Sequence, residues 1–133
     1  MTDKLELELV SPERLLVSAE ADMVVVPGSE GDFGVLSGHA PVISSVRPGV
    51  IEVHDEDKET ERIFITGGFA EVTAEGLTVL AEEAIPVAEM DREDLEQRLR
   101  NAEEDLEDAE TDEATHRTQA TIVLLTEMLK AVA

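Results

Sequence analysis

Glycine and proline are confined to one part of this chain, and their distribution constrains the fold more than any other feature. All eight glycines and all five prolines lie at or before Pro86, whereas residues 87–133 contain neither. Both residues interrupt helices and favour turns, so their frequent recurrence predicts short elements joined by tight connections. We therefore expect a β domain over residues 1–87 and a helical segment over residues 88–133.

The first part of the chain has the pattern of many short strands. Leu5, Leu7 and Leu9 alternate with other residues, a period of two that buries one face of a strand. Further β-branched runs follow at close spacing, at residues 14–19, 22–26, 42–46, 50–54, 62–66, 69–73, 77–81 and 84–87. Such a series is typical of a β-sandwich, or flattened barrel, of about ten strands. Its predicted core positions include Leu7, Val25, Ile43, Ile65 and Leu80.

After Pro86 the pattern changes to that of two amphipathic helices. Asp91 is suited to cap the first helix, and the interruption at Thr111 predicts that Asp112 caps the second. A short connection between two such helices predicts an antiparallel hairpin. Its apolar seam is predicted to consist of Leu95, Leu99, Leu106, Ile122, Leu125 and Leu129. A seam this thin buries little area, so we expect a mobile hairpin that docks reversibly.

The charge of the chain restricts its partners. Ten Lys and Arg residues stand against 32 Asp and Glu residues, which gives a formal net charge of -22. A polyanion repels phosphate groups, so nucleic acids and anionic lipids are excluded as favoured partners, and basic protein surfaces are favoured instead. No apolar run approaches the roughly 20 residues that a membrane span needs, so we expect no direct membrane insertion.

No motif of the sequence predicts a catalytic site. His39, His54 and His116 lie in unrelated contexts, and the chain has no cysteine. The glycine-rich segment 28–34, GSEGDFG, lacks the Gly-Lys-Ser/Thr ending of a phosphate loop. Segment 54–59, HDEDKE, lacks the glycine and distal glutamate of a calcium loop, and we interpret it as a solvated hairpin tip. We therefore expect no catalysis, no cofactor and no bound metal.

Three ordered segments resemble the epsilon subunit of bacterial F-type ATP synthases. They are residues 26–41, VPGSEGDFGVLSGHAP, then Arg47-Pro48-Gly49, then residues 66–72, TGGFAEV. Their order and separations match that family, as does a sandwich followed by a helix hairpin, so the resemblance covers essentially the whole chain. It implies a non-catalytic subunit of the central stalk, which is part of the rotor.

The resemblance also implies partners and contact residues. The sandwich of an epsilon subunit binds the gamma subunit and rests on the polar loops of the c-ring, so that proton-driven rotation reaches the catalytic head. By position, Glu30 and Asp32 correspond to the loop that faces the c-ring. Ser11, His39 and Ser44 correspond to the surface that faces gamma. The implied location is the cytoplasmic face of the bacterial inner membrane, as a peripheral part of the ATP synthase.

The resemblance further implies a regulatory role for the hairpin. In some members of the family the hairpin extends to the alpha and beta subunits and blocks ATP hydrolysis, and some members bind ATP through the pattern Leu/Ile-Asp-x-x-Arg-Ala. Residues 95–100 of this chain read LEQRLR, which departs from that pattern at Glu96, Leu99 and Arg100. An alternative function is a small-ligand module that senses a nucleotide, but the chain lacks a basic phosphate site for it.

Overall fold

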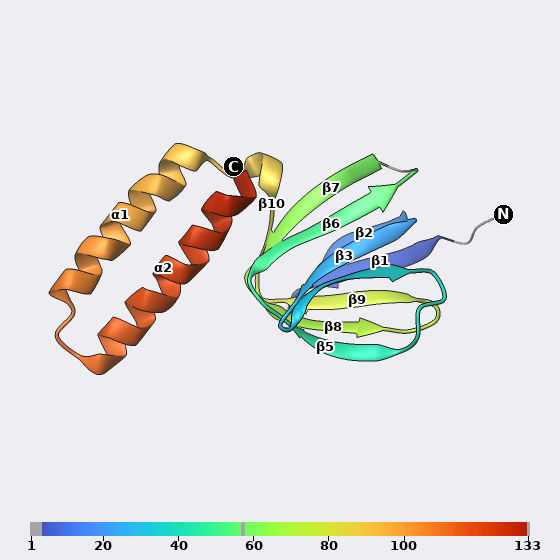
Figure 1. The fold of residues 1–133 in the computed structure, drawn as a ribbon, viewed down its shortest axis with the longest axis horizontal. Helices are drawn as coiled ribbons and strands as arrows, with labels where there is room; N and C mark the ends of the chain where they lie inside the picture. Colours follow the sequence, from blue (N-terminus) through green and yellow to red (C-terminus); the bar gives the residue numbers. More distant parts are fainter. Residues whose placement is uncertain (1–3, 57, 133) are drawn as a thin grey trace. The chain divides into compact units, whose positions relative to one another are not determined.

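The computed structural model describes residues 4–56 and 58–132, and the chain divides into two compact units between Pro86 and Val87 (Figure 1). The first unit contains the strands β1 (Leu5–Val10), β2 (Leu15–Ala21), β3 (Met23–Gly28), β4 (Gly31–Leu36), β5 (Val42–Val46), β6 (Gly49–Asp55), β7 (Lys58–Ile65), β8 (Gly68–Val72), β9 (Gly76–Ala81) and β10 (Ala84–Pro86). The second unit contains a 3₁₀ turn, η1 (Val87–Glu89), and the helices α1 (Arg92–Asp108) and α2 (Asp112–Val132). The predicted fold class, a ten-stranded sandwich followed by two helices, is confirmed.

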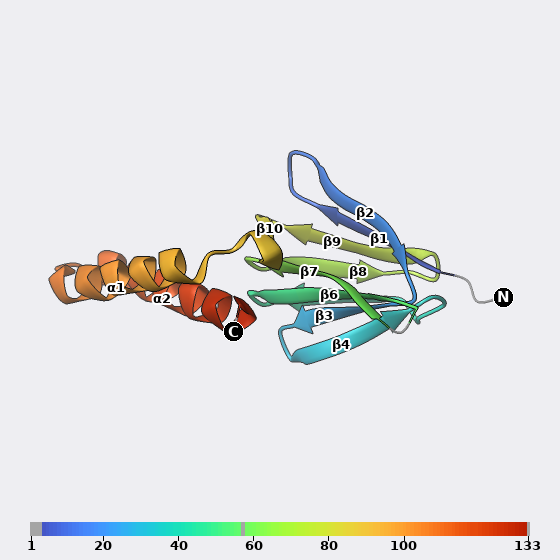
Figure 2. The ribbon, with the colours of Figure 1, turned by 90° about the horizontal axis from the view of Figure 1, so that it is seen from above.

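The strands form a nearly closed sandwich of two layers. One layer has the order β4-β3-β6-β7-β10 and the other has the order β5-β8-β9-β1-β2. A pair between Gly28 of β3 and Val46 of β5 joins them. Figure 2 shows β4 beside β3 on one side of this unit and β2 beside β1 on the other. Paired strands are antiparallel except β1 and β9, which run parallel.

Alternating residues fill the space between the layers, as the period of two predicts. Leu7 and Ile65 are buried, with 1% and 0% of their surface exposed. The predictions for Ile43 and Leu80 were wrong, because these side chains are 72% and 42% exposed. Both belong to the outward positions of their strands, and their neighbours along the chain take the inward ones. Val25 is only half-buried, for the same reason.

The glycine-rich segment after β3 folds as a strand rather than as a loop alone. β4 pairs with β3 from Leu36 back to Gly31, and its Val35 is fully buried in the core. Gly31 has a φ of +132°, which favours glycine. A Cβ atom on Gly28 would lie 2.6 Å from the Gly31 carbonyl oxygen. These two glycines therefore serve a tight hairpin turn.

The second unit is an antiparallel pair of helices that lie side by side (Figure 1). Asp91 caps α1 as predicted, since its carboxylate accepts a hydrogen bond of 2.9 Å from the Glu93 amide. The prediction that Asp112 caps α2 was wrong. Thr111 Oγ1 accepts a 3.0 Å hydrogen bond from the Ala114 amide, and Asp112 is the first residue of the helix. Neither described helix is long and apolar enough to cross a membrane.

The hairpin buries small and flexible side chains as well as leucines. Of the predicted seam, Leu95 and Leu125 are buried. The other predicted seam residues are half-buried, namely Leu99, Leu106, Ile122 and Leu129. Three further residues of the hairpin are buried, namely Ala102, Met128 and Ala131.

Candidate interaction surfaces

The outward side of the layer β5-β8-β9-β1-β2, called here the outer face, carries exposed apolar side chains. Its register joins three of them and the half-buried Val10, one strand after another, into a line that we call the apolar row: Phe69, Leu80, Val10 and Leu15. Phe69 is 57% exposed and Leu15 is 55% exposed. Ile43, which is also exposed, belongs to the neighbouring row. A contiguous set of exposed apolar side chains is typical of a surface that binds a partner.

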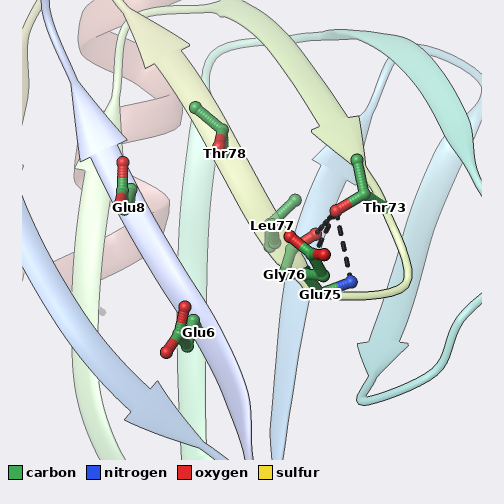
Figure 3. A pocket seen from close by; sticks show the side chains of 7 residues that line it. All are labelled: Glu6, Glu8, Thr73, Glu75, Gly76, Leu77 and Thr78. Atoms are coloured by element: carbon green, nitrogen blue, oxygen red, sulfur yellow. Dashed lines mark hydrogen bonds between the residues drawn. The ribbon is translucent and has the colours of Figure 1, made fainter.

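Carboxylates border the apolar row on the same face. Glu6 and Glu8 of β1 and Glu75 of the β8–β9 turn line a shallow hollow of about 160 Å³ (Figure 3). Thr73 Oγ1 holds this turn, because it accepts hydrogen bonds of 3.3 Å from the amides of Glu75 and Gly76. The outer face therefore combines an apolar row with a negative border.

Two of the residues expected to face gamma lie near opposite ends of this layer. Ser11 follows Val10 in the β1–β2 turn, where its Oγ accepts a 3.3 Å hydrogen bond from the Arg14 amide. His39 lies in the β4–β5 loop, with Nδ1 2.6 Å from the Ala40 carbonyl oxygen. The register places Ser11 at the Leu80 end of the layer, whereas the loop of His39 leads into the other end.

The third expected residue, Ser44, does not share the outer face. It pairs with Ala70, which is fully buried, so its position on β5 is an inward one. Its hydroxyl donates a 3.0 Å hydrogen bond to the Ser45 carbonyl oxygen. Ser44 is half-buried, because β5 forms the edge of its layer. The structure therefore brings Ser11 and the apolar row together and leaves Ser44 on the other side of the sheet.

The two acids expected to face the c-ring lie in and beside the β3–β4 turn. Glu30 is exposed at the tip, and Asp32 is 58% exposed at the start of β4. Asp32 forms an ion pair with Arg47, whose backbone amide donates a 3.0 Å hydrogen bond to the Pro27 carbonyl oxygen. The turn thus presents one acid with a cation beside it and one acid at the tip.

An ion-pair cluster that no sequence pattern predicts joins the start of β1 to two distant turns. Lys4 lies 3.1 Å from the Asp22 carboxylate and also pairs with Asp55. These carboxylates, Asp55 before Asp22, raise the pKa of Lys4 by accepting its hydrogen bonds. The pKa of Asp22 is lowered, first by a 2.7 Å hydrogen bond from the Glu56 amide and then by Lys4. Because Lys4 and Asp55 are 51 positions apart, no local pattern in the sequence indicates their contact.

Residues 95–100 of α1, which stand at the position of the nucleotide-binding pattern, form no assembled anion site among the described residues. Arg100 donates a 2.9 Å hydrogen bond to the Gln97 side-chain oxygen, and Gln97 donates one of 2.9 Å to Asn101. These contacts follow the surface of a single helix. On α2, Lys130 lies 3.1 Å from the Glu127 carboxylate. The hairpin thus uses two of its cations in local contacts.

Comparisons with known proteins relate both the sequence and the fold to one subunit. Residues 4–87 match the family described as ATP synthase, Delta/Epsilon chain, beta-sandwich domain. The ATP synthase epsilon chain of Paramagnetospirillum magneticum is 52% identical over 133 residues, which is 100% of each chain. That of Maricaulis maris is 56% identical over 133 residues, which is 100% of this chain and 98% of the relative.

Two solved structures share the fold at low sequence identity. A chain of the Euglena gracilis mitochondrial ATP synthase, in its OSCP/F1/c-ring part, superposes with a TM-score of 0.87 at 23% identity, over 98% of this chain and 82% of that one. A chain of the Tetrahymena thermophila mitochondrial ATP synthase, in its central stalk and c-ring part, gives a TM-score of 0.68 at 14% identity, over 99% and 98%. The resemblance read from the three sequence segments is confirmed, and so is the prediction of a non-catalytic chain, since epsilon is a non-catalytic subunit. This chain belongs to the ATP synthase epsilon chain family.

Proposed function

We propose that this chain works in the rotor of a bacterial ATP synthase, where it connects the gamma subunit to the c-ring and transmits rotation. The observation that carries the proposal is the outer face, with its exposed apolar row, on a chain of the epsilon family. A subunit under torque needs contacts that hold their register. Closely packed apolar side chains supply such contacts, whereas single exposed ion pairs contribute only about 0–1 kcal/mol.

The gamma subunit is the proposed partner of the outer face. The apolar row favours an apolar strip on gamma, and the carboxylates of Glu6, Glu8 and Glu75 favour Lys or Arg residues beside that strip. Ser11 adjoins the row and belongs to the proposed contact, and His39 extends it at the far end. Ser44 takes part only where gamma reaches around the edge of β5.

The c-ring is the proposed partner of the β3–β4 turn. Its acids attract cationic groups on polar ring loops, and complementary charges fix the register of two surfaces. Arg47 already compensates part of the charge of Asp32. We therefore assign the larger electrostatic share to Glu30. With this contact the chain lies at the cytoplasmic face of the inner membrane, held peripherally by its partners.

The helix hairpin is proposed to regulate hydrolysis only weakly. A hairpin that reaches the alpha and beta subunits needs cations to engage acidic parts of them. After Arg100 this chain has only Arg117 and Lys130 as permanent cations, and Lys130 pairs with Glu127. Its contact with alpha and beta is therefore expected to be weak.

A matched pair of charge insertions tests the assignment of the outer face. Leu15 and Leu36 are equally exposed, at 55% each, but Leu15 belongs to the apolar row and Leu36 lies on β4 in the other layer. We expect Leu15→Asp to weaken binding to purified gamma at least about tenfold, because it places a charge in an apolar contact. Leu36→Asp is expected to bind as the wild type does.

Titration calorimetry with gamma measures both affinities, and circular dichroism melts confirm that each variant is folded. Phe69→Asp provides a second test of the same row, with an expected loss of the same order. Equal affinities for Leu15→Asp, Phe69→Asp and the wild type would move the gamma contact away from the outer face.

A further inference from the structure

Three potential metal ligands meet on the outward side of the β6–β7 hairpin, in the layer opposite the outer face. A ring nitrogen of His54 and one carboxylate oxygen each of Glu52 and Glu59 all lie within 4.8 Å of one another. His54 Nε2 and Glu52 Oε1 are 3.1 Å apart. The three side chains come from neighbouring strands, so the backbone ladder fixes their spacing.

An irregularity in the strand register brings the third ligand to this site. Glu52 pairs with Arg62 and Val53 pairs with Glu61, but the register then shifts, so that His54 pairs with Glu59. Such a bulge turns a side chain that would otherwise point elsewhere. Here it puts Glu59 on the same side of the hairpin as His54, whereas Val53 between the other two ligands is buried in the core.

The donor set selects a class of ion. One imidazole with two carboxylates suits Zn²⁺, Co²⁺ and related transition metals, whereas Mg²⁺ and Ca²⁺ prefer sites made only of oxygen ligands. Bond lengths of about 2.0–2.2 Å around a tetrahedral Zn²⁺ put neighbouring ligands roughly 3.4 Å apart. The 3.1 Å between His54 and Glu52 is close to that value. The Glu59 side chain, 38% exposed, has room to complete the set by a rotation.

The charges around the site both attract a metal ion and compete with it for a ligand. The chain carries a formal charge of -22, which concentrates cations at its surface. Arg62 works in the opposite direction, since its Nε lies 3.5 Å from Glu59 Oε1 and holds that carboxylate. A metal ion must displace this contact, so removing the guanidinium should tighten metal binding.

We propose that Glu52, His54 and Glu59 form a surface site for a divalent transition-metal ion of the Zn²⁺ class, which bridges strands β6 and β7. Water completes the coordination, because all three side chains are partly exposed. A metal that binds only the folded hairpin stabilises the first unit. The proposed site differs from a calcium loop in segment 54–59. Two of its ligands, Glu52 and His54, alternate along β6, and the third, Glu59, comes from the facing strand β7. Asp57 of that segment lies outside the described residues.

Zn²⁺ titration of the full chain, freed of metal by a chelator, tests the site. We expect one Zn²⁺ per chain above the weak background of the many carboxylates, and a visible absorption spectrum with Co²⁺ that reports nitrogen and oxygen ligands. His54→Gln and Glu59→Gln should each weaken the Zn²⁺ affinity at least tenfold. Arg62→Gln should strengthen it several-fold, because Glu59 then loses the guanidinium that competes with the metal.

The other two histidines provide matched controls, since His39→Gln and His116→Gln should bind Zn²⁺ like the wild type. Melting curves without metal confirm that each variant is folded, and added Zn²⁺ should raise the Tm of the wild type but not of His54→Gln. Wild-type Zn²⁺ affinity in both His54→Gln and Glu59→Gln would overturn the proposal. Full displacement of Zn²⁺ by an equal concentration of Mg²⁺ would also overturn the proposal, because it would show that the acidic surface attracts any divalent cation.

Discussion

Asp22 is a single side chain that secures three segments far apart in the sequence. Its carboxylate accepts a hydrogen bond from the Glu56 backbone amide and faces the Lys4 ammonium. The backbone amide of Asp22 donates a 2.9 Å hydrogen bond to the His54 carbonyl oxygen. Lys4 in turn pairs with Asp55. The start of β1 and the β6–β7 turn are therefore linked through one half-buried cluster whose strength depends on pH.

We expect Asp22→Asn to lower the Tm near pH 7 and to match the wild type in acid. The pKa of Asp22 is lowered in the folded chain. Its charged form therefore stabilises the fold above the unfolded-state pKa of about 3.9, and this stabilisation is lost as the pH falls through the folded-state pKa. Thermal melts from about pH 2 to pH 7 measure the effect, with exposed Glu13→Gln as the control. A Tm difference that stays constant into acid would assign the loss to packing.

At single positions, the sequence predicted the alternation of inward and outward residues along a strand better than it predicted which residues point inward. Leu5, Leu7 and Leu9 were placed correctly because they alternate with the acids Glu6 and Glu8. On β5, apolar residues occupy both sides, so the pattern alone did not show that Ile43 points outward. The exposed positions of the apolar row were missed for the same reason, since an exposed leucine has the same sequence signature as a buried one.

At the level of elements, the β7–β8 turn depends on a close approach of two backbones. Gly68 has a φ of +152°, and a Cβ atom there would lie 1.8 Å from the Leu80 carbonyl oxygen. We expect Gly68→Ala to lower the free energy of unfolding by about 2–5 kcal/mol, because it adds a clash to backbone strain. Urea unfolding measures the change.

Gly31→Ala is the matched control for this turn. Gly31 has a similar φ of +132°, but a Cβ atom there would meet nothing within 4 Å. Gly31→Ala should therefore lower the free energy of unfolding only through backbone strain, by about 1–3 kcal/mol. Equal losses at Gly31 and Gly68 would mean that the close approach to Leu80 contributes nothing.

The elements that the sequence predicted correctly are those with clear limits in the sequence. The two helices follow the last proline of the chain, and the strand Val42–Val46 has the predicted bounds. β4 was not separated from its loop, because glycines and acids mask the two inward positions of Phe33 and Val35. Asp112 was predicted as the cap of α2 in place of Thr111, because either residue type can accept the same hydrogen bond from a backbone amide.

On the scale of the whole molecule, the two units should differ in stability. The first unit buries a continuous core, whereas the hairpin has a thin seam and a run of exposed acids from Glu103 to Glu110 that repel one another. We expect amides of residues 91–132 to exchange with solvent before those of the sandwich strands, and more slowly at high salt, which screens the acids.

Hydrogen exchange followed by mass spectrometry measures this order, and a chain that ends after Ala88 provides the control. That chain should melt cooperatively, because the core of the first unit lies entirely before Val87. A shortened chain without a sigmoidal melt would contradict the independence of the sandwich.

The parallel pairing of β1 with β9 has a consequence for how the protein is made. β1 has β2 on one side and β9 on the other, and its register with β9 joins Leu7 to Leu77. A nascent chain emerges with its N-terminus first, so the β1–β2 hairpin leaves the ribosome long before its second neighbour exists. Until residue 81 has emerged, the apolar side of that hairpin has no complete layer to join. Such distant pairings also slow folding, so β1 is synthesised well before β9 but is among the last strands to be secured.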